Sequence, residues 1–110
     1  MTVLRARPLL RRRLASRCEA GERVLAAERA LATRDLWALT DRAVLVVPNR
    51  RGEPTRTGLA EARVTVAAFG SGLSVVLRSL SGGTQIAAFP PGSALVARLR
   101  ALPSAETPTP

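Results

Sequence analysis

Residues 36–47 constrain the fold more than any other part of the chain. They read Leu-Trp-Ala-Leu-Thr-Asp-Arg-Ala-Val-Leu-Val-Val. Two largely apolar runs, 36–40 and 43–47, are separated by a short polar step, which is the pattern of a β-hairpin. Asp41 suits the turn because its carboxylate accepts hydrogen bonds from nearby backbone N–H groups. Residues 44–47 are apolar throughout, which predicts a strand buried on both faces or near the centre of a sheet.

Further β runs follow this hairpin and are divided by turn residues. Alternation of apolar residues predicts strands over 62–68 and 73–77, joined by a glycine turn at 70–72. A third run, 84–89, follows a second glycine turn. Residues 48–58 are rich in proline, glycine and arginine, and their composition predicts a loop.

The β region is followed by one amphipathic helix. Ser93 is a suitable N-cap for a helix over residues 94–102. Its apolar face would hold Leu95, Leu99 and Leu102. Pro103 ends this helix, and residues 103–110 have the composition of a disordered tail.

The N-terminal segment holds most of the excess positive charge. All 17 basic residues of the chain are arginine, and six of them lie in residues 1–18, which contain no acidic residue. Residues 19–110 hold the other eleven arginines and all eight acidic residues. Leu10, Leu14 and Cys18 recur every four residues, which predicts a helix over 8–19. We therefore expect a basic amphipathic arm over residues 1–19.

Residues 22–33 allow two interpretations. Their alanine, leucine, glutamate and arginine content favours a helix, and several apolar positions fit helical spacing. Taken alone, the segment therefore predicts a helix, and a first strand of the β region is the alternative.

Several β runs followed by a single C-terminal helix resemble the pleckstrin-homology (PH) superfold, in its bacterial PH and GRAM-like branch. The resemblance rests on Gly-Glu-Arg-Val-Leu at 21–25, on residues 37–46 and 73–77, and on Ala-Phe-Pro-Pro-Gly at 88–92. These families begin with a Gly-Glu-basic-apolar entry and contain an apolar-Thr-polar-Arg-apolar hairpin. The resemblance covers residues 20–102.

The resemblance implies a mainly β fold of the α+β type. Two packed, orthogonal antiparallel sheets with six or seven strands would be capped by the C-terminal helix, and residues 22–33 would be a strand. The chain then divides into a basic arm at 1–19, a PH-like domain at 20–102 and a tail at 103–110. Lipid-binding members place basic residues around the first hairpin loop. Here that loop offers only Arg34 beside Asp35, which argues against phosphoinositide binding at the usual site.

The composition argues against an enzyme. The chain has no histidine, tyrosine or lysine, which removes the commonest general base and the Schiff-base nucleophile. Cys18 lies on the apolar stripe of its helix, so we expect a buried or incidental thiol. The glycine turns precede no helix and are interpreted as hairpin turns. We expect no catalytic residue, no metal and no cofactor.

Cysteine content and hydropathy bear on location. One cysteine excludes an internal disulfide framework, and no apolar run approaches the ~18 residues of a membrane span. We expect a cytoplasmic protein, peripheral at the inner membrane surface if it binds lipid.

The arginines are the candidate binding residues. In the first hypothesis Arg11, Arg12, Arg13 and Arg17 lie at anionic lipid headgroups while Leu9, Leu10 and Leu14 dip into the membrane. The alternative is a solvated arm whose leucines pack on the domain. A second basic group, Arg50, Arg51 and Arg56, lies in the expected loop at 48–58.

These features predict a non-enzymatic binding module that docks to a protein partner or to an anionic membrane surface through its basic arm. The alternative is a small nucleic-acid-binding β-barrel, because arginines neutralise phosphates whatever the base sequence. Against that alternative, the three aromatic residues Trp37, Phe69 and Phe89 fit core or edge positions and offer no stacking platform. The identity of the partner and the oligomeric state are left open.

Overall fold

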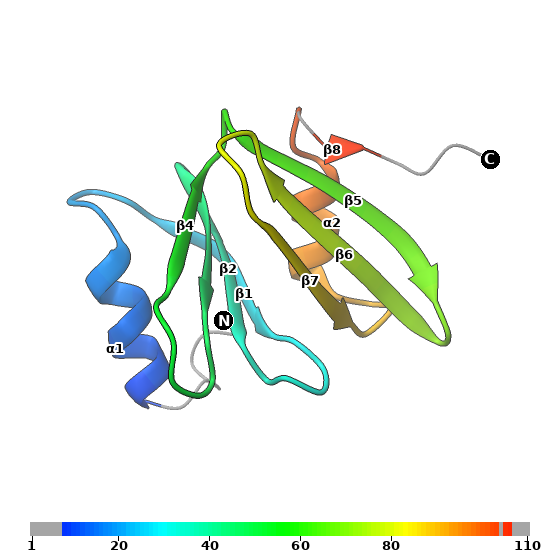
Figure 1. The fold of residues 1–110 in the computed structure, drawn as a ribbon, viewed down its shortest axis with the longest axis horizontal. Helices are drawn as coiled ribbons and strands as arrows, with labels where there is room; N and C mark the ends of the chain where they lie inside the picture. The colour runs from blue at the N-terminus through cyan, green and yellow to red at the C-terminus, as the bar shows by residue number, and fades with distance from the viewer. Residues whose placement is uncertain (1–7, 104, 107–110) are drawn as a thin grey trace.

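The computed structural model describes residues 8–103 and 105–106. Within them the chain forms two helices and eight strands (Figure 1). In chain order these are α1 (Pro8–Arg17), β1 (Val24–Arg29), β2 (Leu36–Thr40), β3 (Ala43–Val47), β4 (Thr55–Gly58), β5 (Ala62–Phe69), β6 (Gly72–Ser79), β7 (Thr84–Phe89), α2 (Ala94–Arg100) and β8 (Ala105–Glu106).

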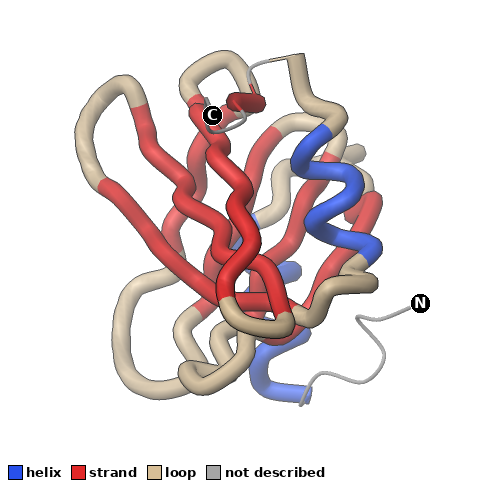
Figure 2. The backbone as a smooth tube through the Cα atoms, turned by 90° about the vertical axis from the view of Figure 1, so that its right-hand side faces the viewer, coloured by secondary structure: helices blue, strands red, loops and turns tan. Residues whose placement is uncertain are grey.

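The strands form two sheets that pack against each other. Sheet A has the order β1-β2-β3-β4, and sheet B has the order β7-β6-β5-β8. All neighbouring strands are antiparallel except β8, which runs parallel to β5. Figures 1 and 2 show α2 beside the strands of sheet B and away from α1. The predicted mainly β fold, with two packed sheets and a helix near each end of the chain, is confirmed.

The main core lies between the two sheets and α2. Trp37 of β2 and Phe89 of β7 meet edge to face, with ring centroids 5.7 Å apart. Leu95 and Leu99 of α2 are buried in the same core. The Ser93 hydroxyl caps α2 by accepting a hydrogen bond from the Val96 N–H, as predicted. The helix therefore closes the space between the sheets.

A second core lies on the opposite, outer face of sheet A, where α1 packs. Leu10 and Leu14 are 2% and 3% exposed, and they contact sheet A residues that include Leu45 and Val47. Every residue of β2 and β3 is consequently buried. The prediction of a strand buried on both faces is confirmed. The hypothesis that Leu10 and Leu14 dip into a membrane is wrong for this structure, because sheet A already covers them.

The ambiguous segment 22–33 contains a strand and not a helix. β1 pairs with β2 along its length, with one irregularity in register between Val24 and Ala26. Pairing with a buried strand outweighs the modest helix propensity of alanine and glutamate. Ala32 and Arg34 adopt left-handed backbone conformations, with φ of 64° and 63°, in the turn that follows. The strand implied by the PH resemblance agrees with this observation.

Two short strands were not predicted. β4 lies inside the segment 48–58 that composition assigned to a loop, because its residues Thr-Arg-Thr-Gly carry no β pattern of their own. β8 lies within residues 103–110, which were assigned to a disordered tail. Residue 104 and residues 107–110 are outside the described part of the chain, as are residues 1–7 of the predicted arm.

Candidate functional site

The two arginine groups predicted from the sequence lie together in the structure. The Arg13 guanidinium of α1 donates hydrogen bonds to the carbonyls of Pro48 at 2.6 Å, Arg50 at 3.3 Å and Gly52 at 2.5 Å. One guanidinium has five N–H donors and can therefore bind several carbonyls at once. Figure 1 shows α1 beside the loop that leads into β4. Arg13 thus fixes this loop, residues 48–54, against the helix.

Arg17 extends the same contact one helical turn further on. Its guanidinium lies 2.7 Å from the Glu53 carboxylate, but these side chains are 45% and 87% exposed. An ion pair that is this accessible to water contributes little to stability. Arg13 and Arg17 therefore connect two surface segments, and Arg13 makes the stronger connection.

Arg56 is not a loop residue, in contrast to the prediction. It belongs to β4, and its guanidinium lies 2.8 Å from one carboxylate oxygen of Glu22 and 3.2 Å from the Arg17 carbonyl. Its side chain is 28% exposed. Because its donors are already engaged within the fold, Arg56 stabilises the junction of α1, β1 and β4.

Glu22 is the centre of this junction, and its side chain is fully shielded from water. Its carboxylate accepts hydrogen bonds from Arg56, from the Thr40 hydroxyl and from the Glu19 N–H. Burial raises the pKa of Glu22, but these hydrogen bonds outweigh burial and lower the pKa to about 2. The carboxylate is charged at neutral pH and has a structural role.

Two of the four segments that carry the PH resemblance, 21–25 and 37–46, meet at this junction. The Arg23 N–H donates to the Asp41 carboxylate, and the Asp41 N–H donates to the Arg23 carbonyl, both at 3.0 Å. Arg42 reaches Glu19 and the Ala20 carbonyl. The Gly-Glu entry and the Thr-Asp-Arg turn therefore hold each other in place, and they do not form an open site.

Three of the seven candidate arginines stay available for binding. Arg12 projects from α1 on the side opposite Leu10 and Leu14, as helical spacing requires. Arg50 and Arg51 are exposed in the loop that Arg13 holds. Within the described residues, the side chains of these three arginines have no hydrogen-bond or ion-pair partner. We call Arg12, Arg50 and Arg51 the basic surface.

Arg11 differs from these three residues. Helical spacing places it on the flank of α1 opposite to Arg13. Its Nε is buried and has no hydrogen-bond partner in the described structure. The structure therefore does not bring Arg11 to the loop at 48–54, although the sequence analysis grouped it with the other arginines.

Neither an activated thiol nor a metal site is found near the junction among the described residues. Cys18 packs against the second core, and burial raises the pKa of its thiol, with a further rise from Glu22 that Arg56 partly opposes. The thiol is therefore not activated as a nucleophile. In the described residues no three acidic, cysteine or histidine side chains group as metal ligands, and no helix is long and apolar enough to cross a membrane.

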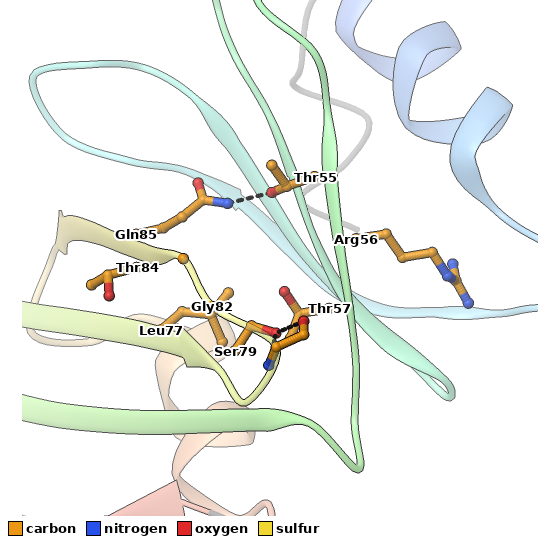
Figure 3. Close-up of a pocket in the computed structure, with 10 residues that line it drawn as sticks. Thr55, Arg56, Thr57, Leu77, Ser79, Gly82, Thr84 and Gln85 are labelled. Carbon is orange, nitrogen blue, oxygen red and sulfur yellow. Dashed lines mark hydrogen bonds between the residues drawn. The ribbon is translucent and has the colours of Figure 1, made fainter.

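One cleft was not foreseen from the sequence. It has a volume of about 500 Å³ and lies between β4 and the turn that joins β6 to β7. Thr55, Thr57, Ser79 and Thr84 contribute hydroxyl-bearing side chains to its wall. Figure 3 shows Gln85 hydrogen-bonded to Thr55 across the cleft and the Arg56 side chain pointing away from it.

The chain was compared with protein-family models, with curated proteins and with solved structures, and none of these comparisons found a match. The PH-like family thus stays a prediction that rests on the residues quoted above. A function has to be inferred from the basic surface and the cleft themselves.

Proposed function

We propose that the protein is a non-enzymatic, PH-like binding module that docks on an anionic membrane surface through its basic surface. The observation that carries this proposal is that Arg12, Arg50 and Arg51 come from two distant segments that Arg13 holds together, and that they are exposed and have no partner among the described residues. Charged side chains that stabilise the fold would have partners within it, as Arg13 and Arg56 do.

The energetics favour lipid headgroups. An arginine near an anionic bilayer surface contributes about 1 kcal/mol to binding, so three of them contribute about 3 kcal/mol. Among the three leucines of α1, Leu9 alone is exposed, at 59%. It lies on the helix flank of Arg13 and offers one apolar contact at the headgroup boundary. Docking would therefore be electrostatic, with little insertion.

Arg13 supports this function as a positioning residue. By binding three carbonyls of residues 48–52, it orders the loop that carries Arg50 and Arg51 before any partner arrives. A loop that is already ordered loses less conformational entropy on binding. The buried leucines of α1 hold Arg13 itself in place.

Vesicle co-sedimentation tests the proposal. We expect the full chain to bind phosphatidylcholine vesicles that contain phosphatidylserine, not to bind phosphatidylcholine alone, and to bind less as salt is raised. The triple variant Arg12→Ser, Arg50→Ser, Arg51→Ser should lose at least about tenfold in affinity. The matched control Arg78→Ser, Arg98→Ser, Arg100→Ser removes the same charge from sheet B and α2.

An equal loss in the two triple variants would contradict a localised surface, since net charge alone would then explain binding. Titration with a single-stranded oligonucleotide tests the alternative function. Trp37 and Phe89 are 2% and 0% exposed and cannot stack on bases, whereas Phe69 is 69% exposed, in contrast to the prediction, and is the one aromatic ring of the described residues that a base could reach. Tight oligonucleotide binding without vesicle binding would favour the nucleic-acid alternative, and binding to neither would leave a protein partner.

A further inference from the structure

Among the four strands that end the two sheets in the described part of the chain, β7 alone has no charged residue and no proline. Natural sheets blunt their edges with charged residues, short strands, bulges or proline. Edge strand β1 has a register irregularity and contains Glu28 and Arg29, β4 has four residues and carries Arg56, and β8 has two residues. β7, with six residues reading Thr-Gln-Ile-Ala-Ala-Phe, has neither charge nor proline.

The ladder between β6 and β7 determines which main-chain groups of β7 point outward. The Ser79 N–H donates to the Gly83 carbonyl at 3.1 Å, and the same register pairs Leu77 with Gln85. Antiparallel pairing alternates, so the N–H and C=O groups of the even-numbered residues of β7 point away from β6. The Ala88 carbonyl agrees with this, since it accepts a hydrogen bond from the Leu31 N–H at 2.8 Å.

Two residues of this edge have unused main-chain groups. No main-chain partner is found for Thr84 or Ile86 within residues 8–103. The Ile86 side chain is also 67% exposed, on the outer face of sheet B. Unpaired backbone groups beside an exposed apolar side chain form a template for another strand.

The cleft of about 500 Å³ adjoins this edge. Its boundary includes Thr84 and Gln85 of β7 on one side and residues of β4 on the other. Leu77 and Thr57 are 2% and 7% exposed. The inner wall of the cleft is therefore formed by an apolar side chain and a hydroxyl-bearing one. With Arg56 turned away, as Figure 3 shows, none of the described residues that line the cleft points a charged group into it. It therefore suits an uncharged side chain.

We propose that the β7 edge accepts one extended segment of a partner protein as an added strand. The segment would exchange main-chain hydrogen bonds with Thr84 and Ile86. Its alternate side chains would point into the cleft, where serine, threonine or valine fits, and outward beside Ile86, where β-branched residues pair well. β4 lines the other side of the cleft and Gln85 reaches Thr55 across it, so we assign the edge to a single chain that displaces this one hydrogen bond and not to the edge of a second folded sheet.

This site shares no residue with the basic surface, so it stands independently of the proposed membrane function. The probe is a fluorescein-labelled, capped peptide, Asp-Thr-Val-Thr-Val-Thr-Asp, followed by fluorescence anisotropy with the full chain. We expect saturable binding below about 1 mM, the range of weak strand addition. No binding at that concentration overturns the proposal.

The Ile86→Pro variant tests the main-chain contact. Proline removes the N–H that points outward and leaves the ladder to β6, because that N–H is not part of it. We expect at least about tenfold weaker peptide binding. Ile86→Thr is the matched control, since it shortens the side chain but keeps the N–H, and its affinity should stay within about threefold. Equal affinity in the two variants overturns the proposal.

Two further measurements keep the test decisive if Ile86→Pro does not fold. The amides of Thr84 and Ile86 should exchange rapidly in the free protein and become protected with peptide, whereas those of Gln85 and Ala87 are protected throughout. Two further peptides are N-methylated, one at its odd-numbered residues and the other at its even-numbered residues. One of the two should lose binding and the other should keep it. If both methylated peptides lose binding, or if neither does, strand addition is overturned. Concentration-dependent dimerisation that Ile86→Pro abolishes would assign the edge to a second copy instead.

Discussion

The outer face of sheet A is covered by a helix, whereas the outer face of sheet B is exposed in the described structure. In sheet A, α1 covers the outer face, and Leu45 of β3 is 0% exposed. In sheet B neither helix of the described residues packs on the outer face, and Ile86 of β7 is 67% exposed. The strand sequences differ accordingly, since β3 is apolar at every position and β5 alternates. The difference teaches that a continuous apolar run predicts a covering element in addition to a strand.

The same contrast holds for polar groups. Beside sheet A, Glu22, Thr40 and Arg56 satisfy one another. At the edge of sheet B, Thr84 and Ile86 offer main-chain groups to a partner. The polar side chains beside sheet A are therefore satisfied within the fold, whereas the β7 edge of sheet B presents unpaired main-chain groups in the described structure.

The largest expected effect is in the second core. We expect Leu45→Ala to lower the free energy of unfolding by roughly 2–5 kcal/mol, because it leaves a cavity between α1 and sheet A. Ile86→Ala, at the equivalent outer face of sheet B, should change it by less than about 0.5 kcal/mol. Chemical denaturation of the two variants measures both. Similar losses would show that the two outer faces are equally covered in solution.

Glu22→Gln should have the next largest effect. We expect it to lower the free energy of unfolding by about 2 kcal/mol at neutral pH, because it removes the carboxylate from a shielded ion pair with Arg56. The folded pKa of about 2 lies below the ordinary value of 4.5. This contribution is therefore complete above about pH 4.5 and is lost as pH falls through about 2. Denaturation midpoints from pH 7 to pH 2 should show wild type and variant converging in that window.

Glu53→Gln is the matched control for that change. Glu53 also pairs with an arginine, but its side chain is 87% exposed. We expect this variant to lower the free energy of unfolding by less than about 0.5 kcal/mol at any pH. A loss as large as that of Glu22→Gln would mean that burial does not separate the two ion pairs.

A smaller effect on stability is expected at α2, the helix that packs between the two sheets. Ser93→Ala removes the N-cap of α2 and the hydroxyl that donates to Glu28 at 2.7 Å. We expect a loss of about 1 kcal/mol in thermal unfolding. Ser93→Thr keeps a capping hydroxyl and should lose less than half of that. If the two variants match, the hydroxyl is not the source of the stability.

The smallest effect is expected on the basic surface. Arg50→Ser with Arg51→Ser should change stability by less than about 0.5 kcal/mol, because neither side chain has a partner in the described structure. Arg13→Ala should cost more, since three carbonyls lose their donor. Thermal melts distinguish the two variants. A large loss in the double variant would assign Arg50 and Arg51 a structural role.

Strands with strong apolar patterns were predictable. The bounds of β2, β3 and β7 agree with the sequence prediction, and α2 ends two residues early. β1 was ambiguous because its alanines and glutamate suit a helix, and only pairing with β2 makes it a strand. β4 owes its conformation to β3, whose register it follows. Such strands depend on long-range pairing, which a local pattern does not contain.

The site was predictable only in part. The sequence pointed to Arg12, Arg50 and Arg51, and these are exposed. It also grouped them with Arg13, Arg17 and Arg56, which bind within the fold. Partners for an arginine are set by tertiary contacts, so composition cannot separate a structural arginine from a free one. For the β7 edge the sequence did hold an indication, a six-residue strand without charge.

The single tryptophan and the single cysteine lie in different cores. Trp37 fluorescence therefore reports on the space between the sheets, and alkylation of Cys18 reports on the contact of α1 with sheet A. If α1 undocks while the sandwich persists, labelling under native conditions will be faster than global unfolding allows. Undocking would also free the loop that Arg13 holds. The two intrinsic probes could thus measure how much order the basic surface owes to α1.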